Sequence, residues 1–155
     1  MNFKRSLFKQ HLGLSLLELM LVLTVVATIL LASTRFFRIA TENAKVNNAV
    51  SMIHEITDAS FKWYETNPAF DNGNFNFQTL VNMQLLPIKY FNPSKPAIKN
   101  PWNGGISIEA FGPEHFNVNM TGVPVVSCTK LKNQLAEYNA NCVCTKVICK
   151  ASFTF

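Results

Sequence analysis

The chain has 155 residues, of which 48% are hydrophobic and only 15% charged, and its formal net charge is +5. This length allows one modest domain with a core of its own. Three of the positive charges precede the first apolar block, at Lys4, Arg5 and Lys9. If this front end is removed, the net charge falls to +2. The excess of basic residues is therefore no argument for a nucleic-acid partner.

The first predicted element is an apolar helix that begins near Leu14. From Leu14 to Thr34, 21 residues carry a single charge, that of Glu18. At ~1.5 Å per residue this stretch spans ~30 Å, the thickness of a bilayer core. A cleaved secretory signal is the alternative, and "LLASTRFFR" offers a weak cleavage site. Helical patterning continues beyond that site, so the pattern favours an uncut helix.

The same helix is predicted to continue as an amphipathic segment to about Tyr64. Apolar or small residues recur every three, four or seven positions, at Ile39, Val46, Val50, Ile53, Ile56, Ser60 and Trp63. No proline occurs before Pro68, and Gly13 is the only glycine before Gly73. We therefore expect one nearly continuous helix over 14–64, membrane-bound or bundled at its start and packed on a domain at its end.

Glu18 is a carboxylate inside this apolar stretch and has two interpretations. It lies four residues after Leu14, so it fits a helix-end glutamate that the N-terminal dipole favours. A charge at membrane depth is costly and usually functional. If the chain were cut after Gly13, the new amine of Leu14 in a neighbouring copy would be a cation able to neutralise Glu18.

The remaining pattern predicts an α+β domain. "FNFQTLVNMQLLP" suggests a short helix that ends before Pro87, and the proline-rich segment after it suggests a loop. "ISIEAF" and "HFNVNM" alternate and predict a hairpin. "SCTKLKNQLAEYN" predicts a helix with Ser127 as its N-cap. A last strand is predicted from a period-two apolar face at Val143, Val147, Cys149, Ala151, Phe153 and Phe155, with a break near Lys150.

The four cysteines, Cys128, Cys142, Cys144 and Cys149, lie in the last 28 residues. Their spacing lacks the paired C-x2-C knuckles of zinc sites, and a domain outside the cytoplasm favours disulfides. Alternation places Cys149 on the core face of the last strand. Cys128 begins a helix that must pack on that sheet, so Cys128–Cys149 is our preferred bridge. Cys142 and Cys144 would then lie ~6.6 Å apart, near the limit for a bridge. Cys128–Cys142 with Cys144–Cys149 remains open.

Other polar residues predict no chemistry. His54 and His115 have no acid–nucleophile set beside them, so we expect no enzyme and no catalytic residue. Asp71, Asn72 and Asn74 are too few for a calcium loop, and we expect neither metal nor cofactor. Lys89, Lys95 and Lys99 with Tyr90, Phe91 and Trp102 fit a solvated loop better than a DNA groove.

The N-terminal motif resembles the class III signal of type IV prepilins. The matching features are a short basic leader, Gly13, a hydrophobic residue, a glutamate fifth after the glycine, and a membrane-length run. The resemblance implies that a prepilin peptidase cuts between Gly13 and Leu14 and methylates the amine of Leu14. It also implies that Glu18 is needed for subunit docking. Leu14 departs from the commonest phenylalanine and is more usual in type IVb pilins.

Later segments are similar to the PilS-type pilins of type IVb and conjugative thin pili. They are "NPWNGGISI", "VNMTGVPVVSC" and the terminal "CKASFTF". The resemblance implies the pilin roll, an antiparallel sheet packed on the second half of the long helix, and a disulfide near the C-terminus. We expect a leader over 1–13, a membrane and filament-core half-helix over 14–34, an amphipathic half over 35–66 and a head over 67–155.

The function implied is that of a structural pilus subunit. It would be held in the inner membrane as a precursor and then packed into an extracellular filament. Its expected partners are the prepilin peptidase, an inner-membrane assembly platform and other pilin subunits. The alternatives are a minor pilin, a type II secretion pseudopilin, or an adhesive or DNA-binding pilin.

Overall fold

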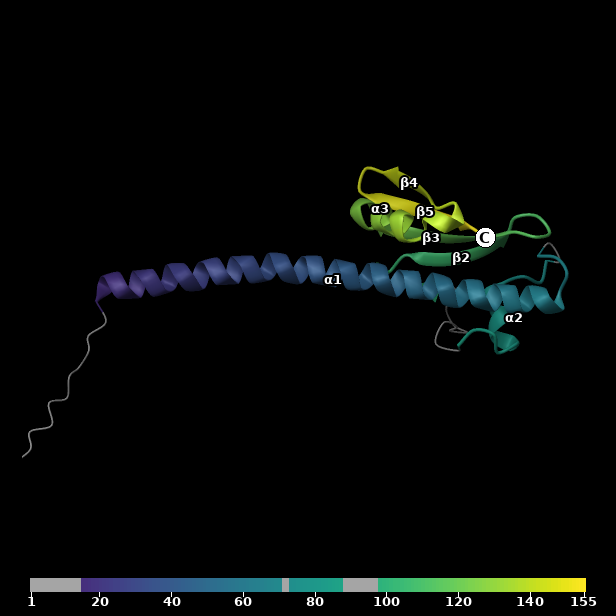
Figure 1. Cartoon of the computed structure of the whole chain (residues 1–155), viewed down its shortest axis with the longest axis horizontal. Helices are drawn as coiled ribbons and strands as arrows, with labels where there is room; N and C mark the ends of the chain where they lie inside the picture. The colour runs from purple at the N-terminus through teal and green to yellow at the C-terminus, as the bar shows by residue number, and fades with distance from the viewer. Residues whose placement is uncertain (1–14, 71–72, 88–97) are drawn as a thin grey trace, which may run out of the picture. The chain divides into compact units, whose positions relative to one another are not determined.

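The structure is a computed structural model that describes residues 15–70, 73–87 and 98–155. Two compact units are present: the first ends at Ile39, and the second runs from Ala40 to Phe155. One helix, α1 (Leu16–Thr66), contributes residues to both units (Figure 1). The predicted helix over 14–64 is therefore confirmed, with ends displaced by two residues.

Within the second unit, α1 buries the predicted stripe. Val46, Ile53, Ile56, Ser60 and Trp63 are at most 2% exposed, and small residues between them, such as Ala49, are buried as well. The spacing works because a 3.6-residue period keeps these side chains on one face of the helix. Ile39, the first member of the predicted stripe, lies in the other unit and is 59% exposed.

The described part of the second unit contains one five-stranded antiparallel sheet. Its order is β1 (Ile98–Lys99), β2 (Gly105–Ala110), β3 (Phe116–Pro124), β5 (Ile148–Thr154) and β4 (Asn141–Thr145). The predicted hairpin is confirmed as β2 and β3, with Ile108 opposite Val118. β1 lies where the sequence predicted a loop. The strand has only two residues in a proline-rich segment, so it shows no alternation of apolar and polar side chains that would predict a strand.

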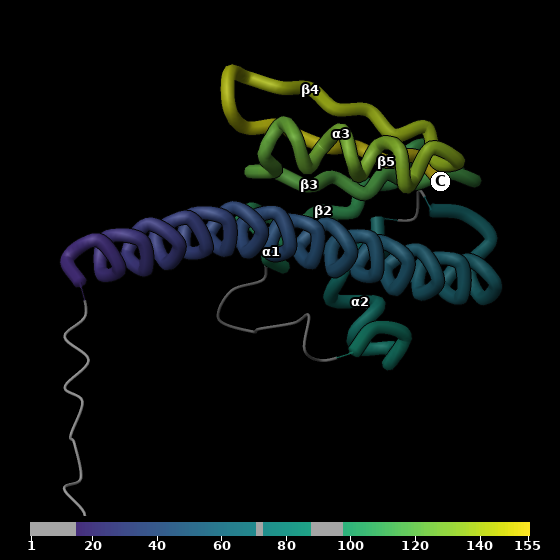
Figure 2. Tube along the Cα trace, turned by 60° about the vertical axis from the view of Figure 1, so that its left-hand side comes forward, coloured from purple at the N-terminus to yellow at the C-terminus, as the bar shows by residue number. Residues whose placement is uncertain are grey.

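One face of the sheet packs on α1 and closes the core. Alternate residues of β3 and β5, such as Val118 and Phe153, are fully buried together with the α1 stripe. Aromatic rings fill the C-terminal end of this core: Phe116 lies 5.0 Å from Phe70 and 5.6 Å from Phe75, centroid to centroid. Figure 2 shows the strands running beside this part of α1, with α2 (Phe77–Asn82) on the other side of the helix. The α+β prediction is confirmed.

Two smaller predictions need correction. The helix α3 begins at Val125 and ends at Gln134, with Pro124 as its N-cap residue, so Ser127 is not the cap. Pro124 suits this place because its extended conformation, φ −61° and ψ 146°, ends β3 and leads directly into the helix. Ser127 instead lies inside α3, buried, and hydrogen-bonds to a side chain of α1.

The single last strand that the sequence predicted is in fact a hairpin. β4 and β5 are joined by a turn at Lys146 and Val147, where Lys146 has a φ of 47°. The predicted apolar face holds in β5, where Cys149, Ala151 and Phe153 are buried. It fails earlier, because the chain reverses at the turn and Val143 and Val147 are 61% and 73% exposed.

Candidate assembly site

The predicted processing site, Gly13 and Leu14, lies outside the described residues. Glu18 lies in the first turn of α1 with its side chain exposed. There the four free N–H groups and the helix dipole favour a carboxylate, which supports the helix-end interpretation for an isolated chain. The second interpretation, pairing with an amine of a neighbouring copy, needs another chain and stays a prediction.

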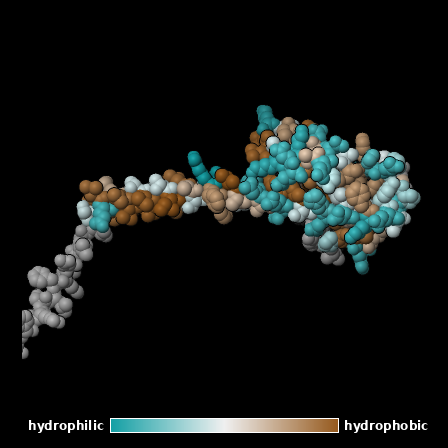
Figure 3. Space-filling model, viewed as in Figure 1, coloured by the Kyte–Doolittle hydropathy of each residue, from teal (hydrophilic) through white to brown (hydrophobic). Residues whose placement is uncertain are grey.

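The first half of α1 is apolar on every side and exposed. Leu16, Leu17, Leu21, Leu30 and Leu31 are each more than 60% exposed. Figure 3 shows this stretch as largely brown, with paler residues along one side. The helix is long and apolar enough to cross a membrane, a test that a signal sequence near the N-terminus also passes. An exposed apolar surface of this extent marks a contact with lipid or with other proteins.

Four hydroxyl side chains of this segment are hydrogen-bonded within the helix. The hydroxyls of Thr24, Thr28 and Thr34 donate to the backbone carbonyls three residues earlier, and Ser33 donates to the carbonyl of Ile29. A hydroxyl paired in this way can enter lipid or a helical bundle without losing a hydrogen-bond partner. Apart from Glu18, the described segment up to Thr34 is therefore suited to an apolar surrounding.

The disulfides contradict the preferred pairing. The structure joins Cys128 to Cys142 and Cys144 to Cys149, which is the alternative left open, so the Cys128–Cys149 prediction is wrong. The reason is the hairpin, which the sequence did not reveal. It sets Cys144 opposite Cys149, with Cα atoms 4.0 Å apart, and places Cys142 one pleat further along β4, beside α3.

Both bridges tie down β4. Val143, Cys144 and Thr145 are exposed and Cys142 is half-buried, so this edge strand gains little from apolar burial. Cys128–Cys142 connects β4 to α3, and Cys144–Cys149 connects it to β5. Apart from Cys142, which packs against the core, this edge strand is held by the two disulfides and by the backbone ladder to β5.

Glu42 is a polar connection that the sequence did not predict. Its Oε2 accepts hydrogen bonds from Trp102 Nε1 and from the Ser127 hydroxyl, each 3.1 Å long, and its Oε1 lies 3.3 Å from Lys45 Nζ. The Trp102 bond is the main cause of a lowered pKa of Glu42, helped by Ser127 and Lys45, while burial opposes it. The carboxylate thus joins α1 to the segment before β2 and to α3.

Sequence reasoning had no means of finding this connection. Its partners are 60 and 85 residues away in the chain, and only the Glu42–Lys45 pair has helical spacing. Trp102 is half-buried, and its indole Nε1 donates a hydrogen bond to Glu42. Close by, Lys130 Nζ donates to Asn43 Oδ1 at 2.6 Å, a second link between α3 and α1.

The other candidate residues form no site among the described positions. No group of three metal-ligating side chains is found there. His115 Nδ1 is 3.1 Å from the carbonyl of Phe155, and Lys99 donates to Asn103, so both have structural contacts. Asp71, Asn72, Lys89, Lys95 and their neighbours Tyr90 and Phe91 lie outside the described residues.

Comparison with known proteins decides the family. The model of the bundlin family matches residues 38–151. The chain belongs to the bundlin family. This membership confirms the resemblance to type IVb pilins and the α+β pilin fold; the matched range begins after the prepilin signal, which stays a prediction.

Two proteins that are similar to this chain have names that state their role. They are the major structural subunits of the bundle-forming pilus from Escherichia coli O127:H6 (strain E2348/69 / EPEC) and from Escherichia coli O111:H-. Each is 25% identical over 129 residues, which covers 79% of this chain and 64% of the relative. The chain therefore spans less than two thirds of the length of these bundlin relatives.

Proposed function

We propose that this bundlin-family chain is the structural subunit of a type IVb pilus. The observation that carries the proposal is the first half of α1, which is apolar on all sides and exposed in the isolated chain. Such a surface is stable in a bilayer or between copies of the same helix, and a pilin uses both in turn. The relatives named as major pilus subunits support the same role.

In this proposal the chain is divided as its sequence predicts. Residues 1–13 form a basic leader that is cleaved off, and 14–34 form the half-helix that holds the precursor in the inner membrane and later fills the filament core. Residues 35–66 carry the amphipathic half of the helix, and 67–155 form the extracellular head. A prepilin peptidase cuts after Gly13 and methylates the amine of Leu14, and an inner-membrane platform assembles the product.

Glu18 has a specific part in assembly. The cut creates a cationic amine on Leu14 at the start of the helix, and a carboxylate within an apolar bundle needs such a partner. Glu18 of one subunit and the Leu14 amine of a neighbour would neutralise each other. The first apolar residues of two helices would then be held in a defined axial register.

The test compares Glu18→Ala with Glu65→Ala in full-length protein in cells. Both glutamates are exposed on α1, but Glu65 lies near its C-terminal end. We expect Glu18→Ala to be processed and then to assemble poorly, and Glu65→Ala to form filaments normally. Wild-type amounts of filament from Glu18→Ala would refute the docking role.

Processing and abundance have their own tests. Gly13→Ala should leave an uncut precursor in the membrane, and efficient loss of residues 1–13 in that variant would contradict the assignment of the signal. Immunogold labelling along purified filaments should be continuous for a major subunit. Sparse or tip labelling would indicate a minor or adhesive pilin instead.

A further inference from the structure

Two exposed surfaces of the second unit, one at each end of β5, carry side chains of opposite charge. The first, the hairpin tip, consists of Val143, Lys146, Val147 and Ile148 at the β4–β5 turn. Val147 and Ile148 are 73% and 54% exposed, and Lys146 is exposed beside them. The tip is thus an apolar projection with a cation on it.

The backbone conformation at the hairpin tip is energetically unfavourable. Lys146 has a φ of 47°, the left-handed conformation that glycine or asparagine adopts more easily in such a turn. A lysine there, followed by two exposed aliphatic residues, gives no folding advantage that the described contacts reveal. Unfavourable local conformations of this kind are associated with function more often than with stability.

The second surface, the aromatic groove, encloses about 460 Å³. Its lining residues come from the end of α1, the β2–β3 turn, the segment after α3 and the end of β5, and include Phe61, Phe111, Glu137, Tyr138 and Phe155. Phe61 and Phe111 are 46% and 60% exposed, and Tyr138 lies 4.6 Å from Phe155 between ring centroids. Glu137 is the acidic side chain among these lining residues.

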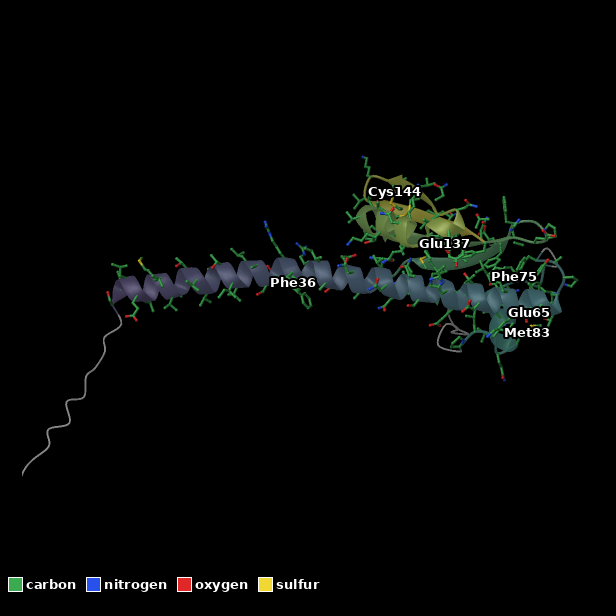
Figure 4. All side chains as sticks on the ribbon, in the orientation of Figure 1. Phe36, Glu65, Phe75, Met83, Glu137 and Cys144 are labelled. Carbon is green, nitrogen blue, oxygen red and sulfur yellow. A yellow bond between two sulfur atoms is a disulfide. The ribbon has the colours of Figure 1, made fainter. Side chains whose placement is uncertain are left out.

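The tip cannot reach the groove of its own chain. β5 begins at the tip with Ile148 and ends in the groove with Thr154, a distance of about 20 Å for an extended strand. Distances along α1 lead to the same conclusion. Ser127, beside the tip, contacts Glu42 of α1, whereas Phe61 of α1 lines the groove. Glu42 and Phe61 are 19 residues apart, which is about 28 Å along a helix. Figures 1 and 2 both show the β4–β5 turn and the C-terminus at opposite ends of β5. Figure 4 labels Cys144 of β4 and Glu137, which is one of the residues that line the groove.

We propose that the hairpin tip of one subunit inserts into the aromatic groove of a second copy of this chain. The inference rests on the proposed function. Pilus subunits insert in one membrane in the same orientation, so the apolar half-helices that they later bundle are all parallel. Copies related in this way make head-to-tail contacts between two different surfaces, which generate open filaments. A two-fold dimer, in which each surface meets itself, is incompatible with that polarity.

The chemistry of the two surfaces fits this occupant. Val147 and Ile148 would cover the exposed faces of Phe61 and Phe111, and removal of such apolar area from water stabilises the contact. Lys146 would approach Glu137 over aromatic rings, where an ammonium gains from both the carboxylate and the ring faces. The offset of about 20–28 Å along the strand and helix would be the axial step between the two contacting subunits.

A photocrosslinking experiment tests the contact. The full chain, assembled into filaments in cells, carries photoreactive benzoylphenylalanine at position 147, or at position 83 as a control. Met83 is an exposed apolar residue at the end of α2, outside both surfaces. Crosslinks from position 147 should map to peptides that contain Phe111 or Tyr138 of another copy, and those from position 83 should not.

A charge exchange gives an independent reading. Lys146→Glu and Glu137→Lys should each lower the filament yield about tenfold by placing like charges together, and the double variant should recover most of it. Wild-type filaments whose crosslinks from position 147 lie outside the groove, or a double variant no better than its parents, would overturn this inference alone. Absence of wild-type filaments would instead refute the proposed function, and this inference with it.

Discussion

The two disulfides should contribute unequally to stability, and their removal tests how β4 is held. Cys128–Cys142 closes a loop across 14 positions, and Cys144–Cys149 closes one across five. Loop-closure entropy assigns about 3 kcal/mol to the first bridge and about 2 kcal/mol to the second. The second bridge also joins residues that the β4–β5 ladder already pairs, whereas the first is the disulfide that ties β4 to α3.

The perturbation is a pair of double variants, Cys128→Ala with Cys142→Ala and Cys144→Ala with Cys149→Ala. Alanine is chosen because Cys128 and Cys149 are buried and should not be replaced by a polar group. Thermal unfolding followed by circular dichroism in detergent should show the larger fall in Tm for the first variant. A loss of about 3 kcal/mol in a domain of this size corresponds to roughly 10–20 °C.

Peptide mapping checks the premise before the melting data are used. Trypsin cuts after Lys130, Lys132, Lys146 and Lys150, which leaves Cys142 and Cys144 on one peptide. The pairing in the structure therefore predicts three peptides joined in one non-reduced species. Joining of only the Cys128 and Cys149 peptides would refute it. If the Cys144–Cys149 variant melted lower than the other, the argument that β4 depends on its link to α3 would be wrong.

Three further predictions concern the second unit. Glu42→Gln should lower Tm by an amount worth about 1 kcal/mol or less at neutral pH. Because folding lowers the pKa of Glu42, the wild-type advantage should be complete above about pH 4.5 and should shrink in melts at lower pH. Gly104→Ala should prevent native folding, seen as loss of soluble or membrane-held protein, since its Cβ would collide with the Thr121 carbonyl. Gly105→Ala is the control, because its Cβ would come no closer than 3.6 Å to Thr121 Oγ1, and it should fold normally. Phe116→Ala should cost about 3–5 kcal/mol in denaturant unfolding, because the ring is fully buried among aromatic neighbours, and a loss below 1 kcal/mol would contradict that packing.

The sequence alone determined the features that depend on neighbours in the chain. The 3.6-residue period and the absence of proline predicted α1 to within two residues, and Ile53, Ile56 and Trp63 were placed correctly in the core. Alternation predicted β2 and β3, and a motif of a few adjacent residues around Gly13 and Glu18 led to the pilin family before any comparison.

Tertiary structure decided whatever depends on residues that are distant in sequence. The chain reversal at Lys146 changed the face of β4 and with it the cysteine pairing, because period-two alternation identifies a face only while the strand continues. The Glu42 contacts with Trp102 and Ser127 join segments that only folding brings together. The groove that takes part in the proposed contact likewise draws on four separate segments. Local periodicity therefore specified the elements, while their packing specified the covalent links and the surfaces.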